Sequence, residues 1–96
     1  MPIMRTVTKV RPSTDVEFKV ASKNDHIRST YFDTKKQIHY NKTLSEDKLT
    51  LIVERTFVDR AALDEFENDP VCDVGEAAQI NKDNGIKTTK EVVTLE

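Results

Sequence analysis

Two stretches of alternating apolar and polar residues, 37–44 and 49–57, flank a tetrapeptide of turn-forming residues, Ser45-Glu46-Asp47-Lys48. Successive side chains of a strand point to opposite faces, so this pattern predicts a β-hairpin with one apolar face. The residues on that face are Ile38, Tyr40 and Leu44 in the first strand and Leu49, Leu51 and Val53 in the second. Any fold of this chain has to place that face against a core.

The apolar faces of the two strands coincide only if paired residue numbers sum to an odd value, because a slip of one residue reverses every side chain. A connection of two or four residues satisfies this condition. A three-residue bulged loop would place Leu44 opposite Thr50 and mismatch the apolar faces. The expected pairs are therefore Leu44–Leu49, Tyr40–Val53 and His39–Glu54.

Three further segments with alternating or β-branched residues are predicted to be strands: 3–10, the short segment 16–20, and 87–95. Between the second of these and the hairpin, a short helix is predicted over 23–35. Ile27 and Tyr31 have the i,i+4 spacing of one helix face, and Ser22 followed by Asp25 resembles a capping box.

Two helical segments are predicted between residue 59 and Gly85, separated by Asn68-Asp69-Pro70. Asp59 is expected to cap the first segment. Asp69 is expected to cap the second, which would begin at Pro70, and Gly85 would end it in a left-handed conformation. The expected inner stripes are Ala62, Leu63 and Phe66 in the first segment and Val71, Val74 and Ala78 in the second.

Without the short second strand, this order of elements is the split β-α-β plan of a ferredoxin-like α+β fold, an antiparallel sheet with helices on one face. The 96 residues are expected to form a single domain, 1–96. A domain of this size buries only ~60–65% of its unfolded surface. We therefore expect an obligate homodimer.

The second face of the hairpin supports a pairing of two sheets. It is polar without being charged like a solvated surface, and it consists of His39, Asn41, Thr43, Thr50, Ile52, Glu54 and Thr56. Face-to-face packing of two such sheets would form a closed dimeric α+β barrel.

The segment 57–71, with the later Asn84-Gly85-Ile86 turn, resembles the region after the third strand in the dimeric α+β barrel superfamily, which includes antibiotic-biosynthesis-type monooxygenases. In that superfamily an aromatic strand end leads into an Ala-hydrophobic-Asp-x-Phe helix that breaks at Asp-Pro-Val. The resemblance implies the barrel fold. It also implies, as one candidate activity, a cofactor-independent monooxygenase, isomerase or decyclase acting on an aromatic or polyketide-like molecule. Members that degrade haem use an Asn–Trp–His set, and the absence of Trp argues against that activity.

Composition excludes several other functions. Fifteen Lys and Arg against 17 Asp and Glu, with no basic run longer than Lys35-Lys36, argue against a nucleic-acid partner. Two glycines cannot form a dinucleotide-binding fingerprint, and a single Cys72 cannot form a disulfide. No apolar run approaches the ~20 residues of a membrane span, and no signal peptide is recognised. We expect a soluble, cytoplasmic protein with no cofactor and no membrane partner.

His39 and Glu54 are the candidate catalytic residues. A carboxylate opposite a histidine raises its basicity and, inside a cavity, would make it a general base. The same pair also fits an ordinary cross-strand contact. Tyr40, Asn41 and Tyr31 are candidate ligand-binding residues, although aromatic residues in such positions also form cores.

Other polar residues carry weaker predictions. His26 and His39 lack metal-ligand spacing, so no metal is expected. Cys72 is expected to be a small buried hydrophobe. Arg5 and Lys9 share one face of the first strand and would either receive an anionic ligand inside the barrel or face solvent, of which we favour solvent. The sequence thus predicts an interaction or small-ligand binding protein, with an enzyme of the class above as the alternative.

Overall fold

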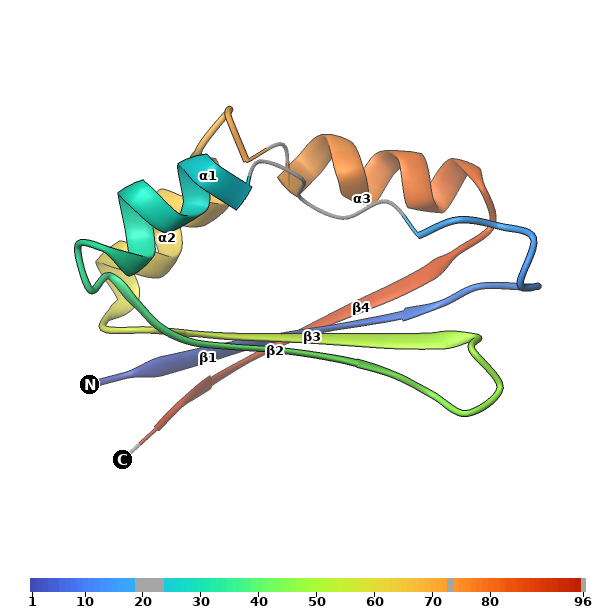
Figure 1. Cartoon of the computed structure of the whole chain (residues 1–96), viewed down its shortest axis with the longest axis horizontal. Coiled ribbons are helices and arrows are strands. Elements are labelled where there is room, and N and C mark those ends of the chain that lie inside the picture. Colours follow the sequence, from blue (N-terminus) through green and yellow to red (C-terminus); the bar gives the residue numbers. More distant parts are fainter. Residues whose placement is uncertain (19–23, 73, 96) are drawn as a thin grey trace.

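The computed structural model describes residues 1–18, 24–72 and 74–95. Its four strands form one antiparallel sheet in the order β2-β3-β1-β4. The strands are β1 (Ile3–Val10), β2 (Gln37–Leu44), β3 (Thr50–Phe57) and β4 (Lys87–Thr94), and the helices are α1 (Asn24–Ile27), η1 (Arg28–Phe32), α2 (Arg60–Asn68) and α3 (Val74–Asp83). All helices lie on one side of the sheet (Figure 1). The predicted ferredoxin-like α+β fold is confirmed.

Strand β1 lies at the centre of the sheet and has the predicted bounds. Its side chains alternate between buried and half-buried positions, with Ile3, Arg5, Val7 and Lys9 buried. These four residues share the face that the helices cover. The central strand therefore places two cations inside the layer between helices and sheet, and the expectation that Arg5 and Lys9 face solvent is wrong.

The hairpin has the predicted parity but a register shifted by two residues. Leu44 lies opposite Leu51, and the connection is the four residues 46–49, closed by a 2.9 Å hydrogen bond from the Ser45 amide to the Thr50 carbonyl. The side chain of Asp47 favours this four-residue connection, because its carboxylate accepts hydrogen bonds from Ser45 Oγ (2.6 Å) and the Leu49 amide (3.0 Å). Leu49 is thereby held in the turn.

The register shift separates the predicted catalytic pair. His39 lies opposite Thr56, and Glu54 lies opposite Asn41. A β-bulge between Gln37 and His39 changes the parity at the start of β2. The predicted cross-strand contact between His39 and Glu54 is therefore wrong.

The first helical segment is shorter than predicted. It spans α1 and the π-helical η1, and it ends before Lys35, which has a positive φ of 62°. Residues 16–18 of the predicted short strand are not in a strand. The rest of that strand and Ser22 of the predicted capping box lie outside the described residues.

Helix α2 matches the prediction, and α3 begins later than expected. The Asp59 carboxylate caps α2 by accepting a 2.9 Å hydrogen bond from the Ala62 amide. After α2, residues 70–72 form a turn, and α3 begins at Val74. Two residues of the predicted inner stripe, Val71 and Ala78, are exposed, so the prediction is wrong for them, and Ala77 and Asn81 are buried instead. The side chain of Val74, the third predicted residue, lies outside the described part of the structure.

The main core lies where η1 and α2 pack on the sheet. Tyr31, Phe57 and Phe66 are fully buried there, with ring centroids 5.2 to 6.4 Å apart. The two pairs that include Tyr31 are edge-to-face, a favourable geometry for aromatic rings. This cluster fixes the position of η1 over β2 and β3.

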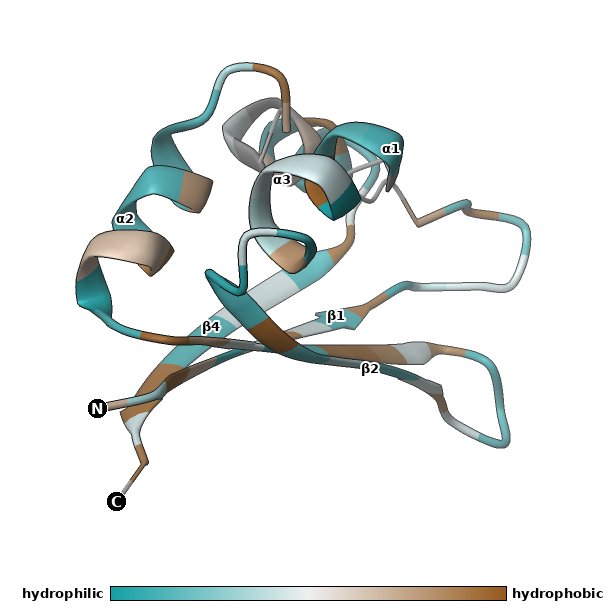
Figure 2. Cartoon of the chain, turned by 60° about the vertical axis from the view of Figure 1, so that its left-hand side comes forward, coloured by the Kyte–Doolittle hydropathy of each residue, from teal (hydrophilic) through white to brown (hydrophobic). Residues whose placement is uncertain are grey.

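The opposite face of the sheet carries no helix of the described chain, as Figure 2 shows from a second direction. It presents the predicted polar side of the hairpin together with alternate residues of β1 and β4. Val10 and Val93 on this face are 40% and 38% exposed.

Candidate ligand-binding site

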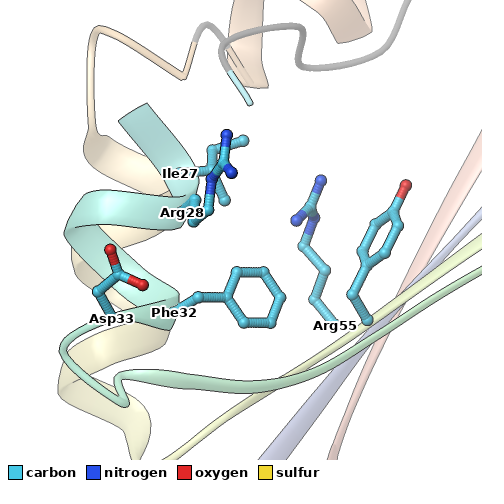
Figure 3. A pocket seen from close by; sticks show the side chains of 6 residues that line it. Ile27, Arg28, Phe32, Asp33 and Arg55 are labelled. Atoms are coloured by element: carbon cyan, nitrogen blue, oxygen red, sulfur yellow. The ribbon is translucent and has the colours of Figure 1, made fainter. Parts of the chain in front are cut away.

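A cavity of about 590 Å³ lies between the first helical segment and the sheet. Its walls come from α1 and η1 on one side and from β2 and β3 on the other. The lining residues are Ile27, Arg28, Phe32, Asp33, Tyr40 and Arg55. Figure 3 shows Phe32 and Arg55 extending into the same space from opposite walls. A cavity with aromatic walls and a few polar groups is the usual form of a small-molecule site.

Arg55 is the charged group at the centre of this site. Arg55 is only 8% exposed. Its guanidinium carbon lies 4.6 Å from the ring centroid of Tyr40 and 5.0 Å from that of Phe66. Burial lowers the pKa of Arg55. In the described part of the chain, no carboxylate lies within ion-pair distance of it. The charge of Arg55 is therefore stabilised by cation–π contacts with two aromatic rings.

Arg5 lies directly opposite Arg55 in the register of β1 and β3. Its Nε is 3.6 Å from a carboxylate oxygen of Glu67, beyond hydrogen-bond distance, and this buried atom has no hydrogen-bond partner among the described residues. Burial lowers the pKa of Arg5, and the charge of Glu67 opposes that shift. Two arginines thus share a poorly solvated layer with one nearby carboxylate.

Lys9 lies further along the same face of β1. Burial and the charges of Arg5 and Arg55 lower the pKa of Lys9 to about 8. The covered face of the sheet therefore carries three cations, Arg5, Lys9 and Arg55, among apolar residues.

The predicted site residues are distributed over three places. Tyr40 lines the cavity. His39, Asn41 and Glu54 lie on the uncovered face, where Asn41 Nδ2 donates to Glu54 Oε1 at 3.4 Å. Tyr31 is fully buried in the aromatic core. The structure therefore brings Asn41 and Glu54 together and separates both from Tyr40.

Sequence reasoning missed Arg55, although a signal was present. Leu51, Val53, Arg55 and Phe57 alternate along β3, so Arg55 occupies a position at which the strand is otherwise apolar. Ile3 and Val7 place Arg5 and Lys9 in the same kind of position on β1. A charged residue in the apolar phase of a strand is the pattern that marks this site.

A second polar cluster joins the first helical segment to the turn after α2. Asp69 Oδ2 accepts hydrogen bonds from His26 Nε2 and Tyr31 Oη, each at 2.7 Å, and Asp69 Oδ1 accepts one from the Val71 amide at 2.9 Å. The hydrogen bond from His26 is the main reason that the pKa of Asp69 falls to about 2. These hydrogen bonds connect the first helical segment to the turn after α2.

Cys72 completes the only group of possible metal ligands that the described residues form. His26, Asp69 and Cys72 place one ligand atom each within 4.8 Å of one another. Cys72 is fully buried, as expected, and burial raises the pKa of its thiol to about 11. A protonated thiol and a carboxylate already engaged in hydrogen bonds fit a structural network better than an open metal site.

No family model matches the chain, and no curated protein sequence matches it. Solved structures do. A conserved protein of unknown function from Bacteroides thetaiotaomicron has a TM-score of 0.71 at 13% identity, over 98% of this chain and 97% of that one. SnoaB, a cofactor-independent oxygenase from Streptomyces nogalater, has a TM-score of 0.64 at 10% identity, over 99% and 93%.

A dimeric ferredoxin-like protein from an uncultured marine organism has a TM-score of 0.53 at 12% identity, over 99% of this chain and 97% of that one. The chain therefore shares the ferredoxin-like α+β fold of these three proteins. The resemblance noted in the sequence is thereby confirmed at the level of fold. Among the described helices, none has the length and apolar character needed to cross a membrane.

Proposed function

We propose that this protein is a small homodimeric binding protein that holds an aromatic small molecule in the cavity beside Arg55. The observation that carries the proposal is the cavity itself. It is walled by Phe32 and Tyr40 and contains a buried guanidinium that no described carboxylate neutralises. Aromatic walls supply apolar contact, and the guanidinium supplies orientation.

The uncovered sheet face supports the homodimer. Val10 and Val93 are exposed there among neutral polar side chains, and a structurally similar protein is dimeric. Pairing two copies through this face would form the barrel. It would also place His39, Asn41 and Glu54 at the interface, which is where any role of these three residues in ligand binding or catalysis would lie. A free thiol at Cys72 is consistent with a reducing, cytoplasmic compartment.

A second candidate function is cofactor-independent oxygenation of an aromatic or polyketide-like molecule in the same cavity. The likeness in fold to a cofactor-independent oxygenase favours it. Tyr40 and Arg55 would be the polar groups nearest the substrate, because both line the cavity. Incubation with a tricyclic anthrone would test this function, with oxygen uptake and quinone formation expected to rise together above the uncatalysed rates.

Two measurements test the proposed function. Light scattering on a size-exclusion peak should give twice 11.0 kDa, and a monomer would contradict the dimer. Binding of 2-naphthalenemethanol, followed by amide chemical shifts, should perturb residues around the cavity. Tyr40→Ala should weaken that binding, whereas Asp64→Ala, on the exposed surface of α2, should leave it unchanged. Equal effects of the two variants would contradict the assignment of the cavity.

A further inference from the structure

We propose that the natural ligand of the cavity is an aromatic carboxylic acid whose carboxylate is bound by Arg55, with Arg5 adding to the positive potential behind it. This inference rests on the proposed function and adds the charge and chemical class of the ligand. It stands on the placement of the two arginines.

The two arginines bring positive charge together on the covered face of the sheet. Arg5 and Arg55 are directly opposed on neighbouring strands, and each residue is 8% exposed. Like charges in opposed positions destabilise a sheet, and a poorly solvated layer increases the cost. The nearest carboxylate, that of Glu67, is shared between Arg5 at 3.6 Å and Lys90 at 2.6 Å. Negative charge from outside the described chain would offset this excess.

The cavity wall carries two other charged residues, Arg28 and Asp33. Arg28 is engaged by Asp25, whose carboxylate lies 2.6 Å from its guanidinium. Asp33, the one lining carboxylate, is exposed at the end of η1 and is not within ion-pair distance of Arg55. Of the two arginines that line the cavity, Arg55 is therefore the one that has no counter-ion among the described residues.

The guanidinium of Arg55 lies next to two aromatic rings. Tyr40 and Phe66 lie against its guanidinium with centroid distances of 4.6 and 5.0 Å. Stacking on aromatic faces leaves the N–H groups in the plane of the guanidinium for acceptors. A carboxylate is the planar acceptor that matches two parallel N–H groups. Phe32, which extends toward the same space, would contact the aromatic part of the ligand (Figure 3).

The contribution of the ligand's carboxylate can be measured with two probes that differ in that group. We would titrate 2-naphthoate and 2-naphthalenemethanol, which share a ring system, into the wild-type protein, Arg55→Met and Arg60→Met. Arg60 is an exposed residue of α2, so its replacement changes the net charge equally without touching the cavity. Calorimetry gives the affinities, and the Nε–H resonances of the arginines show which side chains respond.

We expect 2-naphthoate to bind the wild-type protein about 10- to 100-fold more tightly than the alcohol, the range of hydrogen bonds to a charged group. Arg55→Met should abolish that difference by weakening the binding of 2-naphthoate, and Arg60→Met should preserve it. The Arg55 Nε–H resonance of the wild-type protein should shift further with 2-naphthoate, which accepts a hydrogen bond through its carboxylate, than with 2-naphthalenemethanol. That measurement needs no variant and remains decisive if Arg55→Met fails to fold.

Equal affinities for the two probes, or a preference that Arg55→Met retains, would overturn the carboxylate proposal while leaving the aromatic cavity intact. Absence of binding by both probes would overturn the carboxylate proposal together with the proposed function. A shift at arginines outside the covered face, with none at Arg55, would show surface attraction only and would also overturn the proposal.

Discussion

The guanidinium groups of Arg5 and Arg55 come from directly opposed positions on β1 and β3, on the sheet face that the helices cover. Opposed positions on adjacent strands usually hold apolar or oppositely charged pairs. Here one cation is paired at 3.6 Å with Glu67, and the other is stacked on Tyr40 and Phe66. An arrangement that costs stability and lies beside a cavity is typical of a functional site.

Arg55→Met should therefore stabilise the ligand-free protein. The substitution removes a buried like-charge interaction and keeps an unbranched side chain between the two rings. We expect the free energy of unfolding to rise by about 1 kcal/mol, the lower end of the gains seen when buried ionic groups are replaced by apolar ones. Urea denaturation of the wild-type protein and the variant checks this, with Arg60→Met as the exposed control that should stay within about 0.5 kcal/mol. A loss of stability in Arg55→Met would show that its aromatic contacts outweigh the charge repulsion.

Glu67→Gln should destabilise the protein by about 2 kcal/mol. Burial alone would raise the pKa of Glu67, but the hydrogen bond from Lys90 and the charge of Arg5 hold that pKa below its usual value. Loss of the carboxylate charge leaves Arg5 buried without compensation, which is the costly way to break a buried pair. Glu65→Gln is the matched control on the same helix, because Glu65 pairs with Lys36 near the surface and such pairs contribute less than about 1 kcal/mol. Equal losses in the two variants would contradict the role given to Glu67.

Much of the fold could be predicted because it depends on the alternation of apolar and polar residues along the strands. Strand β1 was predicted to the residue, since Ile3 and Val7 alternate with half-buried polar residues on a central strand. Asp59 and Gly85 were predicted as helix boundaries from local chemistry, and the structure places them there. These features depend on neighbouring residues alone.

The register of the hairpin could not be predicted, because Leu49 and Leu51 have the same parity and only the turn distinguishes them. The hydrogen bonds of the Asp47 side chain decide that question. The hydrogen bonds from His26 and Tyr31 to the Asp69 carboxylate could not be predicted either, because they come from a segment distant in the sequence. Arg55 was missed for a related reason. Arg55 is recognised as a site residue only in the folded protein, where Tyr40, Phe66 and Arg5 are its neighbours.

Stability should fall in acid because of Asp69. Its pKa is about 2 in the folded protein and about 3.9 in an unfolded chain, so the unfolded state binds protons first as the pH decreases. The contribution of Asp69 is therefore complete above about pH 5 and is lost progressively as the pH falls toward about 2. We expect Asp69→Asn to cost roughly 1 to 2 kcal/mol at neutral pH through lost charge-assisted hydrogen bonds. The variant should also show a shallower decline between about pH 5 and 2.

Denaturation curves at a series of pH values check the Asp69 prediction. Asp64→Asn serves as the control, because Asp64 forms an exposed pair with Arg60 on α2. The difference in stability between wild type and Asp69→Asn should shrink toward low pH, and the difference for Asp64→Asn should stay small throughout. A constant difference for Asp69→Asn would show that Asp69 acts without its charge.

The two glycines should respond to alanine in opposite directions. Gly75 lies in α3, and an added Cβ would meet no atom within 4 Å, so Gly75→Ala should stabilise the protein by up to about 1 kcal/mol through helix propensity. Gly85 ends the same helix with a φ of +79°, where an L-residue is strained, so Gly85→Ala should cost about 1 to 2 kcal/mol. Thermal unfolding of both variants checks this pair. Similar shifts of Tm in one direction would contradict the assignment of Gly85 as the residue that ends α3 and directs the chain into β4.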